Sequence, residues 1–207
     1  MIHELQSPLA KHFVNRLRDS KTDARDFRRL IGQLTLLLCD ALLDSSDMHK
    51  TPLQTWQGEQ MLEVVREQKL VFVTILRAGL PMLEAAMEFF PEVQAGFIAM
   101  KRDETTHEAV LYYDRVPECE GKHVVILDPM VATGGSLSDA VTLLNGKKPE
   151  RITSLNVIAA PEGLDAVQRR HPNLSLYVAQ VDEHLDKNKF IVPGLGDAGD
   201  RAFNTPS

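Results

Sequence analysis

Hydrophobic residues in the first ~45 positions recur with the spacing of amphipathic helices. Ser7 and Pro8 suit the N-cap and first turn of one helix, and a second helix is expected from about Asp23. The apolar stripe of the first comprises Leu9, Phe13, Val14 and Leu17, and that of the second Phe27, Leu30, Ile31, Leu34, Leu37, Leu38 and Leu42. Such stripes suit helices that cover a sheet or another subunit.

From Leu70 onward, short apolar runs alternate with helical segments. The runs are LVFVTIL, AGFIAM, HVVILD, ITSLNVIAA and LSLYVAQV. Continuous β-branched runs separated by helices are typical of parallel strands that are buried on both faces. We therefore predict an α/β fold with a mostly parallel, doubly wound sheet. At 207 residues the chain fits one domain, spanning residues 1–207.

Three appendages are expected around this sheet. The N-terminal helices occupy residues 1–50. The segment AVLYYDRV at 109–116 alternates less regularly than the other strands and suggests a β-hairpin arm over about 104–116. A C-terminal hood follows the last strand, at about 182–207.

Composition narrows the class of protein. The apolar runs are far shorter than the roughly 20 residues that cross a bilayer, so no membrane span is expected. The start MIHELQSPLAKHF lacks the features of a secretory signal, which favours a cytoplasmic location. Cys39 and Cys119, the only two cysteines, are expected to be reduced thiols. A net charge of -6 argues against binding to nucleic acid.

The most informative segment follows the run HVVIL. This strand ends at Asp128, a loop carries Thr133, Gly134, Gly135 and Ser136, and a helix begins directly afterwards. Adjacent glycines, hydroxyls and a helix N-terminus suit a phosphate group. Neither GxxxxGK[ST] nor a strand followed by GxGxxG is present. Taken alone, the loop is equally compatible with an ordinary strand-to-helix turn.

Four motifs in this order together carry a resemblance to a known family. VVILDPMVATGGS resembles the phosphoribosyl diphosphate signature of type I phosphoribosyltransferases, in the form found in uracil phosphoribosyltransferase. IVPGLGDAGDR at 191–201 resembles the uracil-binding hood of the same family, and ILRAGL at 75–80 and KRDETT at 101–106 also match. The similarity extends over nearly the whole chain.

The resemblance implies a set of site residues. Asp128 and Arg102 would be catalytic. Phosphoribosyl diphosphate would be bound by Arg77, Arg102, Asp128, Pro129, Met130, Val131, Ala132, Thr133, Gly134, Gly135, Ser136 and Asp197. Uracil would be bound by Ile191, Gly196, Asp197 and Ala198, largely through the backbone. Guanidinium groups suit phosphate oxygens, and a carboxylate suits a ribose that develops positive charge.

The implied reaction joins uracil to 5-phosphoribosyl 1-diphosphate, giving UMP and pyrophosphate in pyrimidine salvage. Magnesium is the implied cofactor, held mainly by the substrate diphosphate with no dedicated protein ligands. A homodimer is expected, since the N-terminal stripes and Leu111, Tyr112 and Tyr113 of the arm lack an evident cover. The residues leave open a higher oligomer and activation by GTP.

Two other functions compete with this interpretation. A nucleotide-sensing regulator of the same fold would bind RNA through a basic face, which the acidic balance disfavours. Purine and orotate phosphoribosyltransferases lack the GLGDAGDR tail. The chain departs from the family pattern at Ala109, Lys189 and Phe190, and DALLDSS lacks an arginine common in the family. His107, His123, His171 and His184 are interpreted as structural or surface residues.

Overall fold

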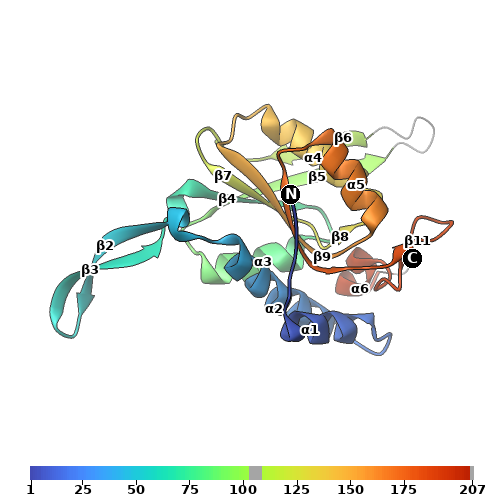
Figure 1. Cartoon of the computed structure of the whole chain (residues 1–207), viewed down its shortest axis with the longest axis horizontal. Coiled ribbons are helices and arrows are strands. Elements are labelled where there is room, and N and C mark those ends of the chain that lie inside the picture. Colours follow the sequence, from blue (N-terminus) through green and yellow to red (C-terminus); the bar gives the residue numbers. More distant parts are fainter. Residues whose placement is uncertain (103–108, 206–207) are drawn as a thin grey trace.

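The computed structural model describes residues 1–102 and 109–205 and has a twisted sheet at its centre (Figure 1). In sheet order the strands are β1 (Ile2–Glu4), β10 (Ser175–Val181), β9 (Arg151–Ala159), β7 (His123–Leu127), β4 (Leu70–Ile75), β5 (Gln94–Arg102) and β6 (Ala109–Arg115). The pairs along this path are parallel except β5 with β6. The short strand β8 (Met130–Val131) pairs with the end of β9.

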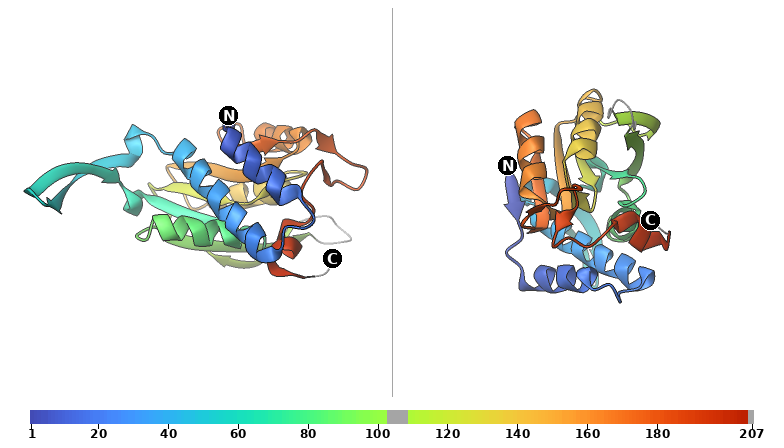
Figure 2. Two further views of the ribbon diagram at one scale, coloured as in Figure 1. Left: turned by 90° about the horizontal axis from the view of Figure 1, so that it is seen from below. Right: turned by 90° about the vertical axis from the view of Figure 1, so that its right-hand side faces the viewer.

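Helices cover both faces of the sheet (Figure 2). One face carries α1 (Pro8–Arg18), α2 (Ala24–Leu42) and α3 (Leu80–Phe89), and the other carries α4 (Gly135–Asn145) and α5 (Pro161–Arg170). Alternate residues of one strand therefore enter different cores. In β4, Leu70 and Phe72 join the core beneath α1–α3, whereas Val71, Val73 and Ile75 join the core beneath α4 and α5. The predicted α/β fold is confirmed.

The two N-terminal helices begin where the sequence predicts. The Ser7 hydroxyl accepts a hydrogen bond from the Ala10 amide at 3.2 Å, and the Asp23 carboxylate accepts one from the Asp26 amide at 2.8 Å. Both are N-cap contacts that satisfy a free amide of the first turn. The apolar stripes of these helices are largely buried against the sheet, so they do not support a subunit interface as the sequence suggested.

An edge strand and a hairpin in the first 65 residues were not predicted. β1 adds a parallel edge strand beside β10. β2 (Met48–Thr55) and β3 (Gly58–Val65) form an antiparallel hairpin that projects far from the body, between the short 3-10 turns η1 (Ser45–Asp47) and η2 (Glu67–Lys69) (Figure 1). The described part of the arm expected at about 104–116 is β6, which pairs antiparallel with β5 at the edge of the sheet; residues 103–108 lie outside the described part.

The chain reverses direction across the sheet between β4 and β7. From β4 it proceeds to β5 and β6 on one side, and from β7 it proceeds to β9 and β10 on the other. In open α/β sheets such a reversal leaves a crevice outside the carboxyl ends of the two central strands, where ligands bind. The C-terminal segment called the hood lies beside this edge, at the lower right in Figure 1. It comprises β11 (His184–Leu185), β12 (Ile191–Val192) and α6 (Ala198–Phe203).

Two further findings concern the cysteines and the length of the helices. Cys39 and Cys119 are both free and buried, as predicted for reduced thiols, and burial raises the pKa of Cys39 to about 12. No helix among residues 1–102 and 109–205 is both long and apolar enough to span a bilayer.

Candidate active site

The loop that follows β4 packs directly against the end of β7. Gly79 lies so close to this strand that a Cβ would stand 2.3 Å from the Leu127 carbonyl oxygen and 2.3 Å from the Thr74 hydroxyl. Only glycine fits there, and it lets the segment carrying Arg77 approach Asp128. Two predicted site residues therefore lie on adjoining loops at the reversal point of the sheet.

Asp128 follows β7 and is buried, with 8% of its surface exposed. Its backbone is fixed: the Asn156 side-chain amide donates to the Asp128 carbonyl at 2.6 Å, and the Asp128 amide donates to the Leu155 carbonyl at 3.3 Å. Burial raises the pKa of the Asp128 carboxyl to about 7, opposed in part by a hydrogen bond from the Met130 amide. The carboxyl thus changes charge near neutral pH, which is frequent among functional groups.

The predicted phosphate loop, residues 129–136, is held by close backbone packing. Met130 and Val131 pair with Ile158 and Ala159 at the end of β9. Gly134 has φ +76°, and a Cβ on it would stand 2.5 Å from the Val167 side chain and 2.7 Å from the Gly163 carbonyl oxygen. The loop therefore needs a glycine at position 134 both for its conformation and for space.

The loop leads into the N-terminus of α4. Gly134 is the N-cap residue, and no side chain caps this helix end. The first amides of a helix have no partner within the helix, and together with the helix dipole they attract anions. An uncapped helix N-terminus after a Gly-rich loop is compatible with phosphate, and the assignment of this loop to phosphate stays a prediction.

Arg77 connects the β4 loop to the hood. Its guanidinium lies 3.0 Å from the Asp200 carboxylate and 3.3 Å from the Thr205 hydroxyl. The pKa of Asp200 is lowered, first by the Thr205 hydroxyl and then by Arg77. The Arg77 side chain is 56% exposed, so it is accessible to a charged ligand. The backbone of Arg102 ends β5, and its side chain lies outside the described part.

The hood contains a sharp turn between β12 and α6. Gly194 and Gly196 have φ of +62° and +80°, and a Cβ on Gly194 would stand 2.1 Å from the Ile191 carbonyl oxygen. Ile191 and Ala198 are buried at 8% and 1% exposure. Buried side chains leave the backbone as the part of these residues that a ligand can contact.

Contacts join the hood to the β4 loop. A Cβ on Gly199 would stand 3.9 Å from the Ala78 amide nitrogen, which places α6 against that loop. The Asp197 carboxylate accepts a hydrogen bond from the Asp200 amide at 2.8 Å and caps α6. Phe190 does not pack in the hood, since its side chain is 57% exposed. Lys189 adopts φ +68°, in the left-handed region that favours glycine.

Several residues that shape this site carried little signal in the sequence. Gly79 lies within the motif ILRAGL, but only its contact with β7 reveals its role. Gly163 packs against the Ala132 carbonyl, where a Cβ would stand 2.1 Å away. Asn156 is a polar residue in a buried strand, which in principle marks a buried hydrogen bond.

Of the four histidines interpreted as structural or surface residues, His107 lies outside the described part and the other three fit that interpretation. His123 is buried, with Nε2 3.0 Å from the Thr153 hydroxyl and Nδ1 3.8 Å from the Asp47 carboxylate. His171 lies with Nε2 2.9 Å from the Ser138 carbonyl, and His184 is exposed. A cleft of about 390 Å³ beside Arg151 and His171 lies at the amino ends of β9 and β10, opposite the predicted phosphate loop. It contains no predicted site residue.

A mostly parallel sheet with a Gly-rich loop and a hood at its reversal point is the fold of phosphoribosyltransferases. A hypoxanthine-guanine phosphoribosyltransferase from Bacillus anthracis shares the fold with a TM-score of 0.52 over 81% of this chain and 83% of that chain, at 16% identity. A solved structure from Aquifex aeolicus is much more similar. Its TM-score is 0.91 at 42% identity, covering 98% of both chains.

The sequence comparisons specify the family. The model of the uracil phosphoribosyltransferase family matches residues 4–205. Uracil phosphoribosyltransferases from Aquifex aeolicus and Finegoldia magna are 41% and 40% identical, covering 98% and 96% of this chain and 98% and 95% of theirs. The chain belongs to the uracil phosphoribosyltransferase family, which confirms the family and the class of enzyme expected from its motifs.

Proposed function

We propose that this enzyme joins uracil to 5-phosphoribosyl 1-diphosphate, releasing pyrophosphate and forming UMP for pyrimidine salvage. The observation that carries the proposal is that the loop around Arg77 meets both the end of β7 before Asp128 and the hood at Gly199 and Asp200, at the reversal point of the sheet. Membership of the uracil phosphoribosyltransferase family supports the choice of both substrates.

The phosphate loop supplies the binding site for the 5-phosphate. Residues 132–136 approach the phosphate through backbone amides, and the hydroxyls of Thr133 and Ser136 add donors. Pro129, Met130 and Val131 set the position of the loop by pairing and packing on β9. Arg77 and Arg102 bind the diphosphate, whose charge increases at the leaving oxygen as the bond to C1 of the ribose breaks.

Asp128 acts on the ribose. The carboxylate accepts hydrogen bonds from the ribose hydroxyls and offsets the positive charge that develops on the ring as pyrophosphate leaves. N1 of uracil then bonds to C1, and the N1 proton is lost. The enzyme accelerates this exchange by placing the base and the ribose in line and by stabilising charge.

Magnesium is proposed to enter with phosphoribosyl diphosphate. Within the described residues no group of three or more His, Cys, Asp or Glu side chains is arranged to hold a metal ion. A single carboxylate, Asp128, at the strand end fits a cation that keeps most of its ligands as water and diphosphate oxygens. The bound ion would neutralise diphosphate charge.

The hood reads the base through its backbone. Uracil presents two carbonyl groups and the N3 hydrogen. The segment from Ile191 to Ala198 presents backbone amides and carbonyls that can pair with these groups. Its turns at Gly194 and Gly196 have positive φ, which glycine adopts freely. Asp197 orders this segment because its carboxylate caps α6. The family resemblance implies a second role for Asp197, which is to contact phosphoribosyl diphosphate.

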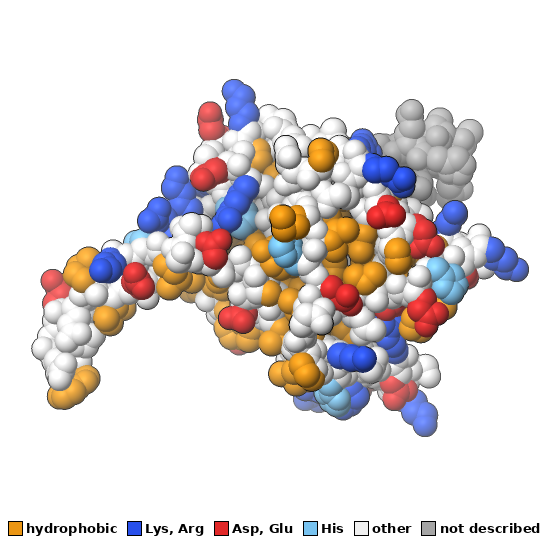
Figure 3. All heavy atoms as spheres, viewed as in Figure 1, with side chains coloured by type: hydrophobic (Ala, Val, Ile, Leu, Met, Phe, Trp, Pro, Cys, Tyr) orange, Lys and Arg blue, Asp and Glu red, His pale blue; other side chains and the backbone are white. Residues whose placement is uncertain are grey.

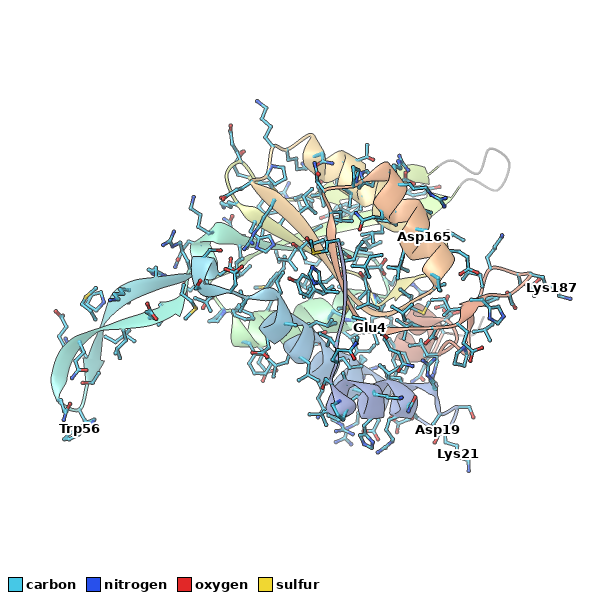
Figure 4. All side chains as sticks on the ribbon, in the orientation of Figure 1. Glu4, Asp19, Lys21, Trp56, Asp165 and Lys187 are labelled. Carbon is cyan, nitrogen blue, oxygen red and sulfur yellow. The ribbon has the colours of Figure 1, made fainter. Side chains whose placement is uncertain are left out.

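The enzyme is proposed to be at least a homodimer and to act in the cytoplasm. The β2–β3 hairpin bears exposed apolar side chains, and its tip residue Trp56 is 92% exposed (Figures 3 and 4). Tyr112 and Tyr113 on β6 are also exposed. Apolar surface of this kind usually marks an interface. Two free buried thiols support a reducing compartment.

A steady-state assay with uracil, phosphoribosyl diphosphate and magnesium tests the proposal. UMP formation that saturates in both substrates is expected. Retention on immobilised RNA without turnover would instead support a nucleotide-sensing regulator of the same fold.

A further inference from the structure

An ion pair between the first helix and the last long strand holds the Gly194 turn. Arg18, the final residue of α1, donates to both oxygens of Asp182 at 2.8 and 2.5 Å. The same guanidinium donates to the Gly194 carbonyl at 2.6 Å, and the Gly194 amide donates to Asp182 at 3.0 Å. Both polar groups of the Gly194 backbone are therefore bound by one Arg–Asp pair.

The pair is buried where the strand meets the hood. The Asp182 side chain is fully buried and that of Arg18 is 15% exposed. A buried ion pair gains little net stability because both charges lose water. Its geometry is more informative: a two-point guanidinium–carboxylate contact fixes orientation as well as distance. Here it fixes the turn three residues after Ile191 and two before Gly196.

The far end of the hood is tied to the same N-terminal helices. Arg201 donates to the Leu17 carbonyl, to the Asp19 carbonyl at 2.8 Å and to the Leu195 carbonyl at 2.8 Å. Its guanidinium also lies 4.6 Å from the centre of the Phe27 ring. The turn between α1 and α2, which carries Asp19 and Lys21, thus lies against the hood (Figure 4).

The phosphate loop is supported by different elements. Its backbone contacts run to β9 and to Gly163 of α5. Neither element belongs to the N-terminal helices. A change at the end of α1 should therefore displace the base side of the site and leave the phosphate side in place.

We propose that Arg18 and Asp182 are positioning residues for base recognition. Helix α1 would then help to set the geometry of the uracil site. They act through Gly194, setting where the backbone of residues 195–198 meets the base. The inference rests on the proposed role of the hood as the uracil-binding segment.

Asp182→Asn and Arg18→Lys test the inference in the full-length enzyme. Asn keeps the volume of Asp but cannot bind both guanidinium nitrogens, and Lys keeps the charge but loses the fork. Displacement of a binding group by about 1 Å can cost up to roughly 100-fold. We expect KM for uracil to rise about 10-fold or more in Asp182→Asn, and less in Arg18→Lys, with KM for phosphoribosyl diphosphate changed less than about threefold.

Arg170→Lys is the matched control. Arg170 pairs with Asp139 at 2.8 Å between α5 and α4, away from the hood. This variant should leave both KM values near wild type. Thermal unfolding of each variant shows whether it is folded, and Arg18→Lys keeps the test decisive if Asp182→Asn does not fold.

The outcomes separate this inference from the proposed function. Equal changes in both KM values, or a lowered Tm with unchanged uracil KM, would overturn the positioning role. Ala198→Val alters the hood directly, because Ala198 is 1% exposed. If it raises uracil KM while Arg18→Lys and Asp182→Asn do not, only the positioning inference fails. If it also has no effect, the hood does not read the base.

Discussion

Asp128→Asn should remove most turnover while making the substrate-free protein more stable at alkaline pH. The carboxyl is buried and its pKa is raised to about 7 from the ordinary 3.8. The folded-state pKa lies above the unfolded one, so the unfolded chain gives up this proton first as the pH rises. Stability is therefore lost between about pH 4 and pH 7, and Asn, which does not ionise, avoids the loss.

The structure sets the size of both effects. The difference between 3.8 and about 7 corresponds to at most about 4 kcal/mol of unfolding free energy above pH 8. Removing an electrostatic partner of the transition state typically costs ~2 to 4 kcal/mol, or roughly 30- to 1000-fold in kcat/KM. Asn keeps the volume and an oxygen that accepts from the Met130 amide, so the loop should keep its shape.

Urea unfolding at pH 5 and pH 8.5 measures the change in stability of Asp128→Asn, and steady-state kinetics measures its loss of turnover. The variant should exceed wild type in stability by a larger margin at pH 8.5 than at pH 5. In wild type, kcat/KM for phosphoribosyl diphosphate should rise with pH through about 7, because this parameter reports groups of the free enzyme. Near wild-type kcat/KM in a folded variant, or an equal stability difference at both pH values, would refute the reasoning.

Three further predictions concern the loop, the core and the subunit contact. Gly134→Ala should raise KM for phosphoribosyl diphosphate and lower the free energy of unfolding by about 1 to 3 kcal/mol, because the new Cβ would stand 2.5 Å from Val167 on a backbone with φ +76°. Steady-state kinetics measures the change in KM, and urea unfolding measures the change in stability. Burial, and after it Arg151, lowers the pKa of His123 to about 4. The unfolded chain therefore takes up this proton first, so stability should fall as the pH drops from 6.5 to 4. His123→Gln should flatten that part of the unfolding profile, and an unchanged slope would contradict the assignment. Light scattering at micromolar concentration should give a molecular mass of at least twice 23.1 kDa, and a mass of 23.1 kDa would contradict the proposed dimer. Dilution should shift the fluorescence emission of Trp56, the only tryptophan of the sequence, as the subunits separate.

Local patterns were sufficient to predict the framework. Ser7 and Asp23 mark helix starts by cap chemistry, and buried β-branched runs such as VVIL mark central strands. The phosphate loop was predictable because its glycines, its hydroxyls and the following helix are adjacent in the sequence.

Features that depend on distant contacts were not predictable. The hairpin of residues 48–65 projects from the body and has little buried surface to impose an alternating pattern. Arg18 and Asp182 are 164 positions apart, and neither stands in a motif. Asp128 was named from a resemblance, but its raised pKa follows from the burial that only the fold creates.

Base selectivity tests the central claim most directly. A backbone frame at Ile191 and Gly196–Ala198 that donates to a uracil carbonyl and accepts from N3–H would face the wrong partners in cytosine, whose amino group replaces the carbonyl and whose N3 carries no hydrogen. Mismatched buried groups can lower kcat/KM by roughly 10⁴-fold. Purines are larger than uracil, and orotate would add a carboxylate close to Asp197. With phosphoribosyl diphosphate saturating, kcat/KM should be high for uracil and lower by large factors for cytosine, adenine, hypoxanthine and orotate, whereas comparable values for cytosine or hypoxanthine would contradict recognition of uracil by the hood backbone.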